Sequence, residues 1–355
     1  MANLHAHTAE TNLKDDGVET PLQLHRALRS NGFDFSLHSI HSVFNPRMTS
    51  SALQEGFEAQ RAAESQLHIP GLTVAVGEEL TVAGGPNFSA HDTLLGYSVP
   101  GNLNHVTILG TSDFIPNGTA LKTACDRAHK KGGVCLVNHP GPGPSRWEPG
   151  LWETVENRAV IDGLEIYNGV GVTTVGFISE DRYLEATSYT GLGCKIAAIA
   201  SPDTHGPHQV EQIRKRVAGT IPGRLMGLFK TPIDLPRPEL AAMTWLQTTP
   251  SSETAVIAAI KARRTVAVFG MPNLHLAMPG IGEIRHEKSV HVSLRLSRPV
   301  ARVELYKNGR SIQTWKDADA AEWSEETSER AAYVFGAQDG AYGHLMTSAL
   351  WYEPQ

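Results

Sequence analysis

Short apolar runs alternate with helical periods over about the first 270 residues, and this alternation constrains the fold most. Most runs are continuous, which is typical of parallel strands covered on both faces. The expected strands are residues 33–37, 72–76, 106–109, 134–137, 164–167, 196–200 and 265–269. Seven such repeats indicate an α/β fold with a closed or nearly closed barrel. An open doubly wound sheet is the alternative, although no Gly-x-Gly-x-x-Gly follows the first strand.

Three helices have recognisable features in the sequence. Thr20 followed by Pro21 is typical of an N-cap and a first helical turn. An apolar stripe over residues 121–128 predicts a second helix, and Thr249-Pro250 is expected to open a third. These helices fit between the expected strands of the barrel.

The pattern changes after Gly282, where apolar and polar residues begin to alternate over residues 290–296. Lys307-Asn308-Gly309-Arg310 then predicts a hairpin with a turn of the primed type. We therefore expect two domains, a barrel over residues 1–280 and a small, sandwich-like antiparallel β domain over residues 285–355.

The overall composition excludes several classes of partner. Lys plus Arg number 31 against 37 Asp plus Glu, and the net charge of −6 gives no general attraction to nucleic acid or anionic membranes. No run of 18 apolar residues is present, so we expect no membrane span. Residues 1–8 lack the apolar run of a signal peptide, which predicts a cytoplasmic protein, or a periplasmic or secreted one if a leader has been removed. Small molecules remain the expected partners.

The chain has three cysteines, Cys125, Cys135 and Cys194. Their number is odd and their neighbours are apolar. We expect buried thiols, with no disulfide framework and no thiolate metal site.

The 16 histidines stand out by their positions relative to the strands. His5 and His7 are two residues apart, so in an extended segment both rings point to one side. Other polar residues follow the expected strands, where the carboxyl ends of a barrel meet on one face. They are His41, Glu79, His139, Asp203 and His205. Imidazole and carboxylate ligands without thiolate suit Zn²⁺, Mn²⁺ or Fe²⁺.

These segments resemble the motifs of the PHP (polymerase and histidinol phosphatase) metal-dependent hydrolases. The similar segments are Leu4-His5-Ala6-His7-Thr8, Asp16-Gly17, Gly77-Glu78-Glu79, Asn138-His139-Pro140-Gly141 and Ser201-Pro202-Asp203-Thr204-His205. Asn104-His105 with the following residues to Gly110, together with Arg264-Thr265-Val266 and the β tail, is similar to the branch that includes carbaryl hydrolase.

The resemblance implies a distorted seven-stranded (β/α) barrel, TIM-like in kind, that holds two or three divalent metal ions. The implied ligands are His5, His7, His41, Glu79, His105, His139, Asp203 and His205, with Asp16 as a weaker candidate. Glu79 would bridge two ions. Its neighbour Glu78 does not match the family spacing after Gly77.

The chain departs from the family pattern after the second expected strand. The family has Thr-Asp-His there, whereas this chain has Ser39-Ile40-His41, with an additional His38. Either His38 replaces the missing contact or one metal position is altered. If residues 38–41 form a turn, His38 and His41 can face one ion, and we expect His38 to lie near the metals.

Several other residues are candidates for contacts around the site. His208 is a candidate substrate contact. Arg146 could bind an anionic substrate, or form a salt bridge or stack on Trp147. Glu165 could support a metal ligand, and Asn168 lies on the expected active face. His25, His68, His91 and His129 are expected to face solvent.

The sequence thus predicts a metal-dependent hydrolase that uses a hydroxide bridging the metals. Asp203 or His208 would transfer the proton to the leaving group. A net positive site favours a phosphoesterase acting on a small molecule. A carboxylic ester or carbamate hydrolase with the same metals is the alternative, and a non-catalytic binding module is a third possibility.

Overall fold

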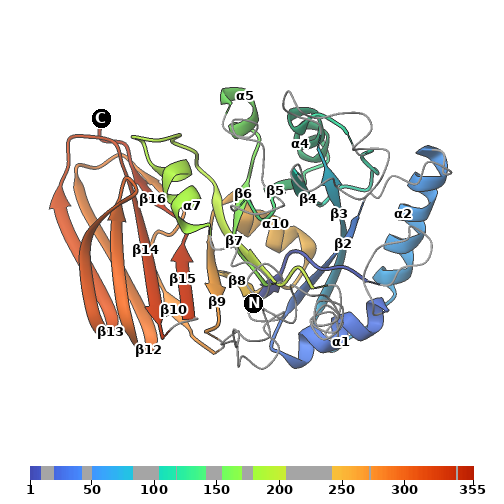
Figure 1. The fold of residues 1–355 in the computed structure, drawn as a ribbon, viewed down its shortest axis with the longest axis horizontal. Coiled ribbons are helices and arrows are strands. Elements are labelled where there is room, and N and C mark those ends of the chain that lie inside the picture. Colours follow the sequence, from blue (N-terminus) through green and yellow to red (C-terminus); the bar gives the residue numbers. More distant parts are fainter. Residues whose placement is uncertain are drawn as a thin grey trace, which may run out of the picture.

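The computed structural model describes residues 1–8, 20–41, 50–82, 104–116, 118–140, 154–169, 179–204, 242–271, 273–340 and 343–355, with only the backbone of His41 and Ser50. In these residues the strands form one mixed sheet of 16 strands that runs across the molecule (Figure 1). Its main path has the order β10-β12-β14-β15-β9-β8-β1-β2-β3-β4-β5-β6-β7. β11 and β16 pair with each other, β16 also pairs with β14, and β13 pairs with β12.

The strands of the N-terminal part are β1 (Ala2–Asn3), β2 (Phe35–His41), β3 (Thr73–Thr81), β4 (His105–Leu109), β5 (Val134–Val137), β6 (Gly163–Asn168), β7 (Ala197–Ser201), β8 (Ala242–Leu246) and β9 (Thr265–Phe269). The C-terminal strands are β10 (Leu276–Ala277), β11 (Ile284–Arg285), β12 (Ser289–Lys307), β13 (Arg310–Glu326), β14 (Ala331–Asp339), β15 (Gly343–Thr347) and β16 (Leu350–Tyr352). The described helices are α1 (Pro21–Ser30), α2 (Ser50–Ser65), α4 (Leu121–Lys130), α5 (Val155–Arg158), α7 (Glu180–Thr187) and α10 (Glu253–Lys261).

The expected seven-stranded (β/α) barrel is wrong. β4 is antiparallel to both β3 and β5, and β8 is antiparallel to both β1 and β9. Among the strands that the structure describes, the parallel pairs are β1–β2, β2–β3, β5–β6, β6–β7 and β11–β16. A continuous apolar run shows that a strand is buried on both faces but not which way its neighbours run. The inferred parallel order therefore failed, although each of the seven expected runs does form a strand.

The end strand β7 lies against β8 as well as pairing with β6. The amide of Ala200 donates to Thr244 Oγ1 over 3.0 Å, and that hydroxyl donates to the Ala200 carbonyl over 2.7 Å. Just beyond β7, Thr204 forms a parallel bridge with Ala6, which follows β1. The sheet curls, and its end strand comes back to the N-terminal segment.

Helix ends follow local capping chemistry. Thr20 caps α1 as expected: its side chain accepts from the Gln23 amide, and the Gln23 side chain completes a capping box. α10 begins three residues later than Thr249-Pro250 would place it, because Ser252 supplies the cap by accepting from the Ala255 amide over 3.1 Å. None of the described helices is long and apolar enough to cross a bilayer.

The C-terminal strands pair antiparallel except for β11 with β16, and the expected hairpin between β12 and β13 is confirmed. Lys307 pairs with Arg310, and Asn308 and Gly309 both have positive φ, 47° and 77°, as a primed turn requires. These strands continue the same sheet, because β15 pairs with β9. The expected boundary between residues 280 and 285 lies at the turn before β11.

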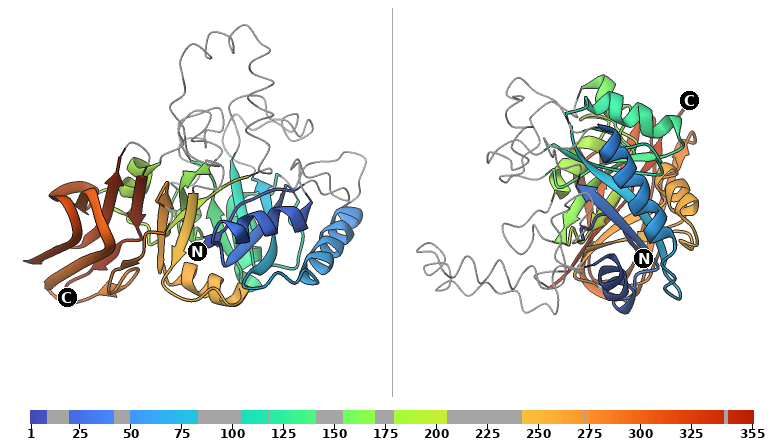
Figure 2. Two further views of the ribbon diagram at one scale, coloured as in Figure 1. Left: turned by 90° about the horizontal axis from the view of Figure 1, so that it is seen from below. Right: turned by 90° about the vertical axis from the view of Figure 1, so that its right-hand side faces the viewer.

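The hydrophobic core is shared between the N-terminal and C-terminal parts. Tyr183 of α7 and Ile196 pack in one cluster with Val334 and Trp351. Figure 2 shows the C-terminal strands at one end of the molecule and α1 and α2 at the other. Because strands and core are both shared, the C-terminal part is packed into the same body as the N-terminal part.

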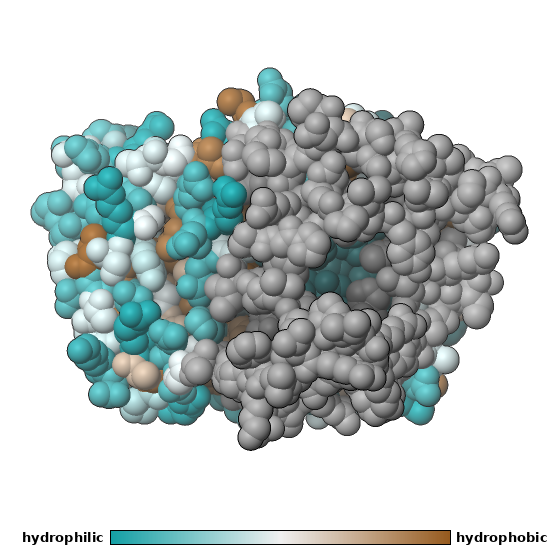
Figure 3. Space-filling view, in the orientation of Figure 1, coloured by the Kyte–Doolittle hydropathy of each residue, from teal (hydrophilic) through white to brown (hydrophobic). Residues whose placement is uncertain are grey.

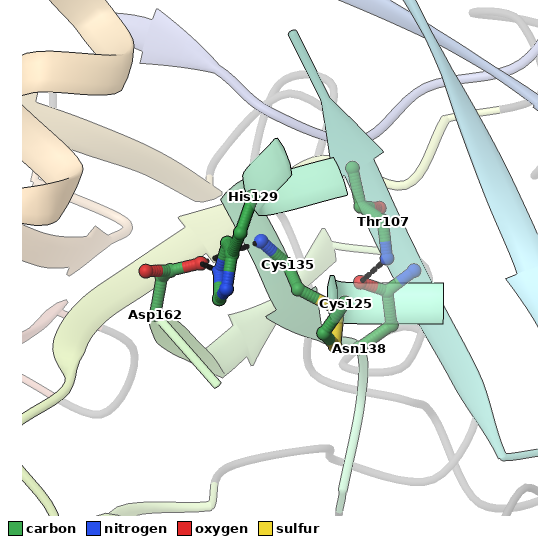
Figure 4. The surroundings of a disulfide bond; sticks show 6 residues. All are labelled: Thr107, Cys125, His129, Cys135, Asn138 and Asp162. Carbon is green, nitrogen blue, oxygen red and sulfur yellow. Dashed lines mark hydrogen bonds and ion pairs between the residues drawn. A yellow bond between two sulfur atoms is a disulfide. The ribbon is translucent and has the colours of Figure 1, made fainter. Parts of the chain in front are cut away.

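The expectation that the chain has no disulfide is wrong. Cys125 of α4 and Cys135 of β5 form one, with their Cα atoms 5.5 Å apart (Figure 4). The tight turn between α4 and β5 packs the apolar face of the helix onto the strand, and this brings two cysteines ten residues apart together. Cys194 is a buried free thiol, as expected.

Candidate metal centre

Six predicted site residues converge where the segment after β1 meets the ends of four other strands. His5 and His7 follow β1, Glu79 lies near the end of β3, and Asp203 follows β7; His105 begins β4 and His139 follows β5. β4 is antiparallel, so its first residue, not its last, lies beside the ends of β3 and β5. Figure 3 shows hydrophilic residues over the region of β2 and β3.

Backbone hydrogen bonds hold the N-terminal segment against β7. The Asp203 amide donates to the His5 carbonyl over 2.9 Å, and the His7 amide donates to the Thr204 carbonyl over 2.8 Å. On the other side, the Ser39 amide donates to the Ala6 carbonyl over 2.8 Å. The two histidines are thus fixed between β2 and the end of β7.

Two groups of buried ligand atoms share Glu79. His5 Nε2 lies 3.1 Å from Glu79 Oε1, and His7 Nε2 lies 3.1 Å from Glu79 Oε2. In the second group, His105 Nδ1 and His139 Nε2 lie 2.9 and 3.4 Å from Glu79 Oε1. Within each group the ligand atoms all lie within 4.8 Å of one another. These buried histidine and glutamate groups could hold metal ions.

The spacing of the ligand atoms fits metal coordination. Two ligands bound about 2.1 Å from one ion at tetrahedral or octahedral angles lie about 3.0–3.4 Å apart. The contacts of Glu79 with His5, His7 and His139 fall within that range, at 3.1, 3.1 and 3.4 Å. His5 Nε2 and His7 Nε2 are 3.2 Å apart, and two imidazole nitrogens this close need a proton or a cation between them.

Asp203 places a second carboxylate, besides that of Glu79, next to the first group. Its Oδ1 atom lies 3.3 Å from His5 Nε2 and 3.4 Å from His7 Nε2. Its backbone has φ of 48°, and that of His139 has φ of 29°. Left-handed backbone at a residue other than glycine costs about 1–3 kcal/mol and is concentrated at functional sites. The strain at these two positions fits a site that must aim particular side chains.

The carboxylates change the protonation of the histidines. Burial lowers the pKa of His5, but Asp203, Glu79 and Glu165 outweigh it and raise that pKa well above the usual value of 6.5. Burial likewise lowers the pKa of His139, and the hydrogen bond to Glu79 contributes most to raising it above the usual value. A metal must displace these protons, so metal binding should strengthen as the pH rises.

Glu165 and Asn168 support the ligands from β6. Glu165 Oε1 lies 3.2 Å from His5 Nδ1, and Oε2 accepts from the His139 amide over 2.7 Å. Asn168 Nδ2 donates to Glu165 Oε2 over 3.0 Å and to Asp203 Oδ2 over 2.8 Å. Residues three apart normally point to opposite faces of a strand, but an irregularity between Glu165 and Tyr167 lets both reach the centre.

Asn138 has a role that the sequence did not suggest. Its Nδ2 donates to Glu79 Oε1 over 2.7 Å, and its Oδ1 accepts from the Thr107 amide over 3.2 Å (Figure 4). Its position immediately before His139 was the available signal. Glu78, in contrast, accepts from the Ile115 amide over 3.0 Å, so the expected preference for Glu79 agrees with where the two side chains lie.

His38 lies in a different buried network. β2 is extended through His41, so the turn that would let His38 and His41 face one ion is not formed. His38 Nδ1 lies 2.5 Å from Glu64 Oε1. Among the described residues, neither group of ligand atoms around Glu79 includes His38.

Ile40 and His25 are both buried. Ile40 packs with Phe57, Val76 and Phe114 in a small apolar cluster, so its side chain does not replace a carboxylate at the centre. His25 is fully buried instead of facing solvent, because its ring bonds Ser36 of β2 and Glu64 of α2. Five other predicted residues lie outside the described side chains: Asp16, His41, Arg146, His205 and His208.

Comparisons with known proteins do not assign this chain to a family. No family model matches the chain, and no curated protein matches it. A β-glucuronidase of Bacteroides uniformis is similar at 9% identity and a TM-score of 0.26, with 99% of this chain and 46% of that chain covered. An FMN-binding β-glucuronidase from Facaelibacterium prausnitzii L2-6 is similar at 9% identity and a TM-score of 0.18, with 91% and 41% covered.

An engineered protein is similar at 11% identity and a TM-score of 0.21, with 99% of this chain and 93% of that chain covered. The chain spans less than half the length of the glucuronidase chains. Likenesses this weak carry no argument about the fold or function.

Proposed function

We propose that this protein is a metal-dependent hydrolase of the kind that the PHP resemblance implies, acting on a small phosphoester. The observation that carries the proposal is Glu79, which is common to two buried groups of ligand atoms. A carboxylate shared in this way is suited to bridging two divalent ions, Zn²⁺, Mn²⁺ or Fe²⁺. His5 and His7 would hold one ion and His105 and His139 the other.

Divalent ions in such a site lower the pKa of a bound water and polarise the bond to be cleaved. The chain's own residues orient the ligands: Glu165 fixes the ring of His5 through Nδ1, and Asn138 fixes the carboxylate of Glu79. Asp203 Oδ1 lies next to both imidazoles of the first group and is the atom we assign to accept and return a proton.

The charge of the centre favours an anionic substrate. Two divalent ions carry more positive charge than Glu79, Glu165 and Asp203 offset, and imidazoles bind metals in the neutral form. A phosphoester complements that excess. A carboxylic ester or carbamate hydrolase with the same residues remains the second candidate, because the resemblance includes carbaryl hydrolase.

The test is a substrate screen with metal analysis. Protein freed of metal by a chelator is reconstituted with Zn²⁺, Mn²⁺ or Fe²⁺ and assayed on nitrophenyl phosphate mono- and diesters beside nitrophenyl and naphthyl esters and carbamates. We expect two to three ions per chain and preferential cleavage of a phosphoester. Faster cleavage of esters or carbamates supports the second candidate, whereas bound metal without turnover of any of these indicates a binding module. Less than half an equivalent of metal after reconstitution contradicts the metal site itself.

A further inference from the structure

Another buried carboxylate, that of Glu64 in α2, lies outside the candidate metal centre and is connected to the N-terminal segment. Its side chain is almost fully buried. Oε2 accepts from His25 Nε2 over 2.8 Å, and Oε1 accepts from His38 Nδ1 and Gln60 Nε2, each over 2.5 Å. Burial raises the pKa of Glu64, but His38 and His25 outweigh it and lower that pKa to about 2. The group is therefore a carboxylate at neutral pH.

One arm of this network reaches the residue after His7. Because Glu64 accepts from Nδ1 of His38, the opposite nitrogen of that ring faces outward from α2. This Nε2 atom lies 3.1 Å from Thr8 Oγ1, which is itself buried. The hydrogen bond ties the end of the His5–His7 segment to β2.

A second arm reaches the start of the same segment. His25 Nδ1 lies 2.7 Å from Ser36 Oγ, which pairs in β2 with Asn3 of β1. Asn3 Nδ2 donates to the Leu37 carbonyl over 3.1 Å, and Asn3 Oδ1 accepts from the His5 amide over 3.1 Å. Both ends of the segment that carries His5 and His7 are thus joined to groups that Glu64 orients.

We propose that Glu64 and His38 act as positioning residues: the chain from Glu64 through His38 to Thr8 fixes the segment that presents His5 and His7 to a metal ion. The inference rests on the proposed metal centre. Outer contacts of this kind matter because a ligand displaced by a fraction of an ångström loses much of its bond, and their removal costs roughly 10–100-fold in metal affinity.

The test compares two substitutions at Thr8. Thr8→Val keeps the shape but removes the hydroxyl, whereas Thr8→Ser keeps the hydroxyl. Each metal-free protein is titrated with Co²⁺, and its visible absorption, which depends on coordination geometry, is recorded with the affinity. We expect Thr8→Val to weaken binding roughly 10-fold and alter the spectrum, and Thr8→Ser to stay within about twofold of the wild type.

A double substitution separates positioning from direct ligation. If His38 acts through Thr8, Thr8→Val combined with His38→Gln binds Co²⁺ no more weakly than the weaker single variant. If the double variant weakens Co²⁺ binding by the product of the two single effects, His38 acts by another route and the proposal is overturned. His129→Gln, which also removes a histidine bonded to a carboxylate but away from this segment, is the control for general destabilisation.

The outcomes distinguish this inference from the proposed function. If Thr8→Val binds Co²⁺ as tightly as the wild-type protein and gives the same visible spectrum, the positioning role is overturned but the metal centre is not. Wild-type protein that binds no Co²⁺ overturns the metal centre and the inference with it. If His38→Gln fails to fold by circular dichroism, the Thr8 pair decides, because both replacements there are close in size to threonine.

Discussion

Glu79 and Glu64 are both buried glutamates surrounded by histidines, but the number and length of their contacts differ. Glu64 receives donors at 2.5–2.8 Å from α1, from β2 and from its own helix α2. Four histidines from three segments surround Glu79, most of them at 3.1–3.4 Å, and Asp203 lies beside two of them. Short contacts between donor and acceptor complete a hydrogen-bond network, whereas longer contacts among several nitrogens and oxygens match the spacing of ligands around an ion.

The difference suggests distinct uses for the same residue types. The Glu64 network fixes the backbone of the N-terminal segment. The groups around Glu79 bring together nitrogen and oxygen atoms that could bind metal ions. Each prediction below changes one side of this comparison and asks whether metal binding or stability responds.

The largest effect is expected for Glu79→Gln. An amide cannot bridge two ions and brings a hydrogen-bond donor toward histidine nitrogens, so metal affinity should fall more than roughly 100-fold and turnover should be lost. Metal content after dialysis and turnover on the best substrate measure this.

Glu78→Gln is the matched control, since its carboxylate bonds the Ile115 amide. It should alter metal affinity by less than about twofold. Metal loss in Glu78→Gln with retention in Glu79→Gln would reverse the assignment of the two neighbours.

Glu165→Gln should have the next largest effect on the metal centre. Glu165 holds His5 through Nδ1 and His139 through its amide, so its replacement should weaken metal binding by roughly 10–100-fold. Titration with Zn²⁺ measures the affinity. Glu180→Gln is the control, because Glu180 bonds Tyr167 and His344 instead of the centre. Equal losses in both variants would mean that the effect is general destabilisation.

The sequence predicted where the strands lie better than how they pair. Apolar runs located β5 and β9 to the residue, because burial on both faces leaves a clear signal. β8 was missed, and β4 was expected to be parallel but is antiparallel, since pairing depends on segments distant in the chain. The same dependence on distant segments explains why the expected barrel was wrong.

Six residues of the candidate centre followed from their motifs and from their positions beside strand ends. The Glu64 network did not, because His25 is a single histidine on an amphipathic helix and Glu64 lies at the end of another helix. Only the packing of α1 and α2 on β2 reveals that both side chains are buried. The disulfide was missed for the same reason, since it depends on how α4 packs on β5.

Glu64→Gln should affect stability and its dependence on pH. The pKa of Glu64 is lowered from 4.5 to about 2 in the folded protein. Its contribution to stability is therefore present above pH 4.5 and lost as the pH falls toward 2. Glu64→Gln should cost about 2 kcal/mol at pH 7, as expected for hydrogen bonds to a charged group. Urea denaturation at pH 7 and pH 3.5 should show a smaller gap between the two proteins at the lower pH, and a constant gap would exclude Glu64 as the titrating group.

The smallest effect concerns His129, whose Nε2 lies 2.7 Å from Asp162 Oδ2 near the protein surface (Figure 4). The hydrogen bond to Asp162 raises the pKa of His129 above 6.5. The stabilisation is therefore complete below pH 6.5 and is lost as the pH rises through the raised value, the opposite sign from Glu64. Because the ring is 32% exposed, His129→Gln should cost less than about 1 kcal/mol. The bond from the Cys135 amide to Asp162 stays in place, so the change isolates the histidine. Urea denaturation should show a gap from the wild type that is larger at pH 6 than at pH 9, with metal affinity unchanged; a gap that grows with pH would contradict the charged pair.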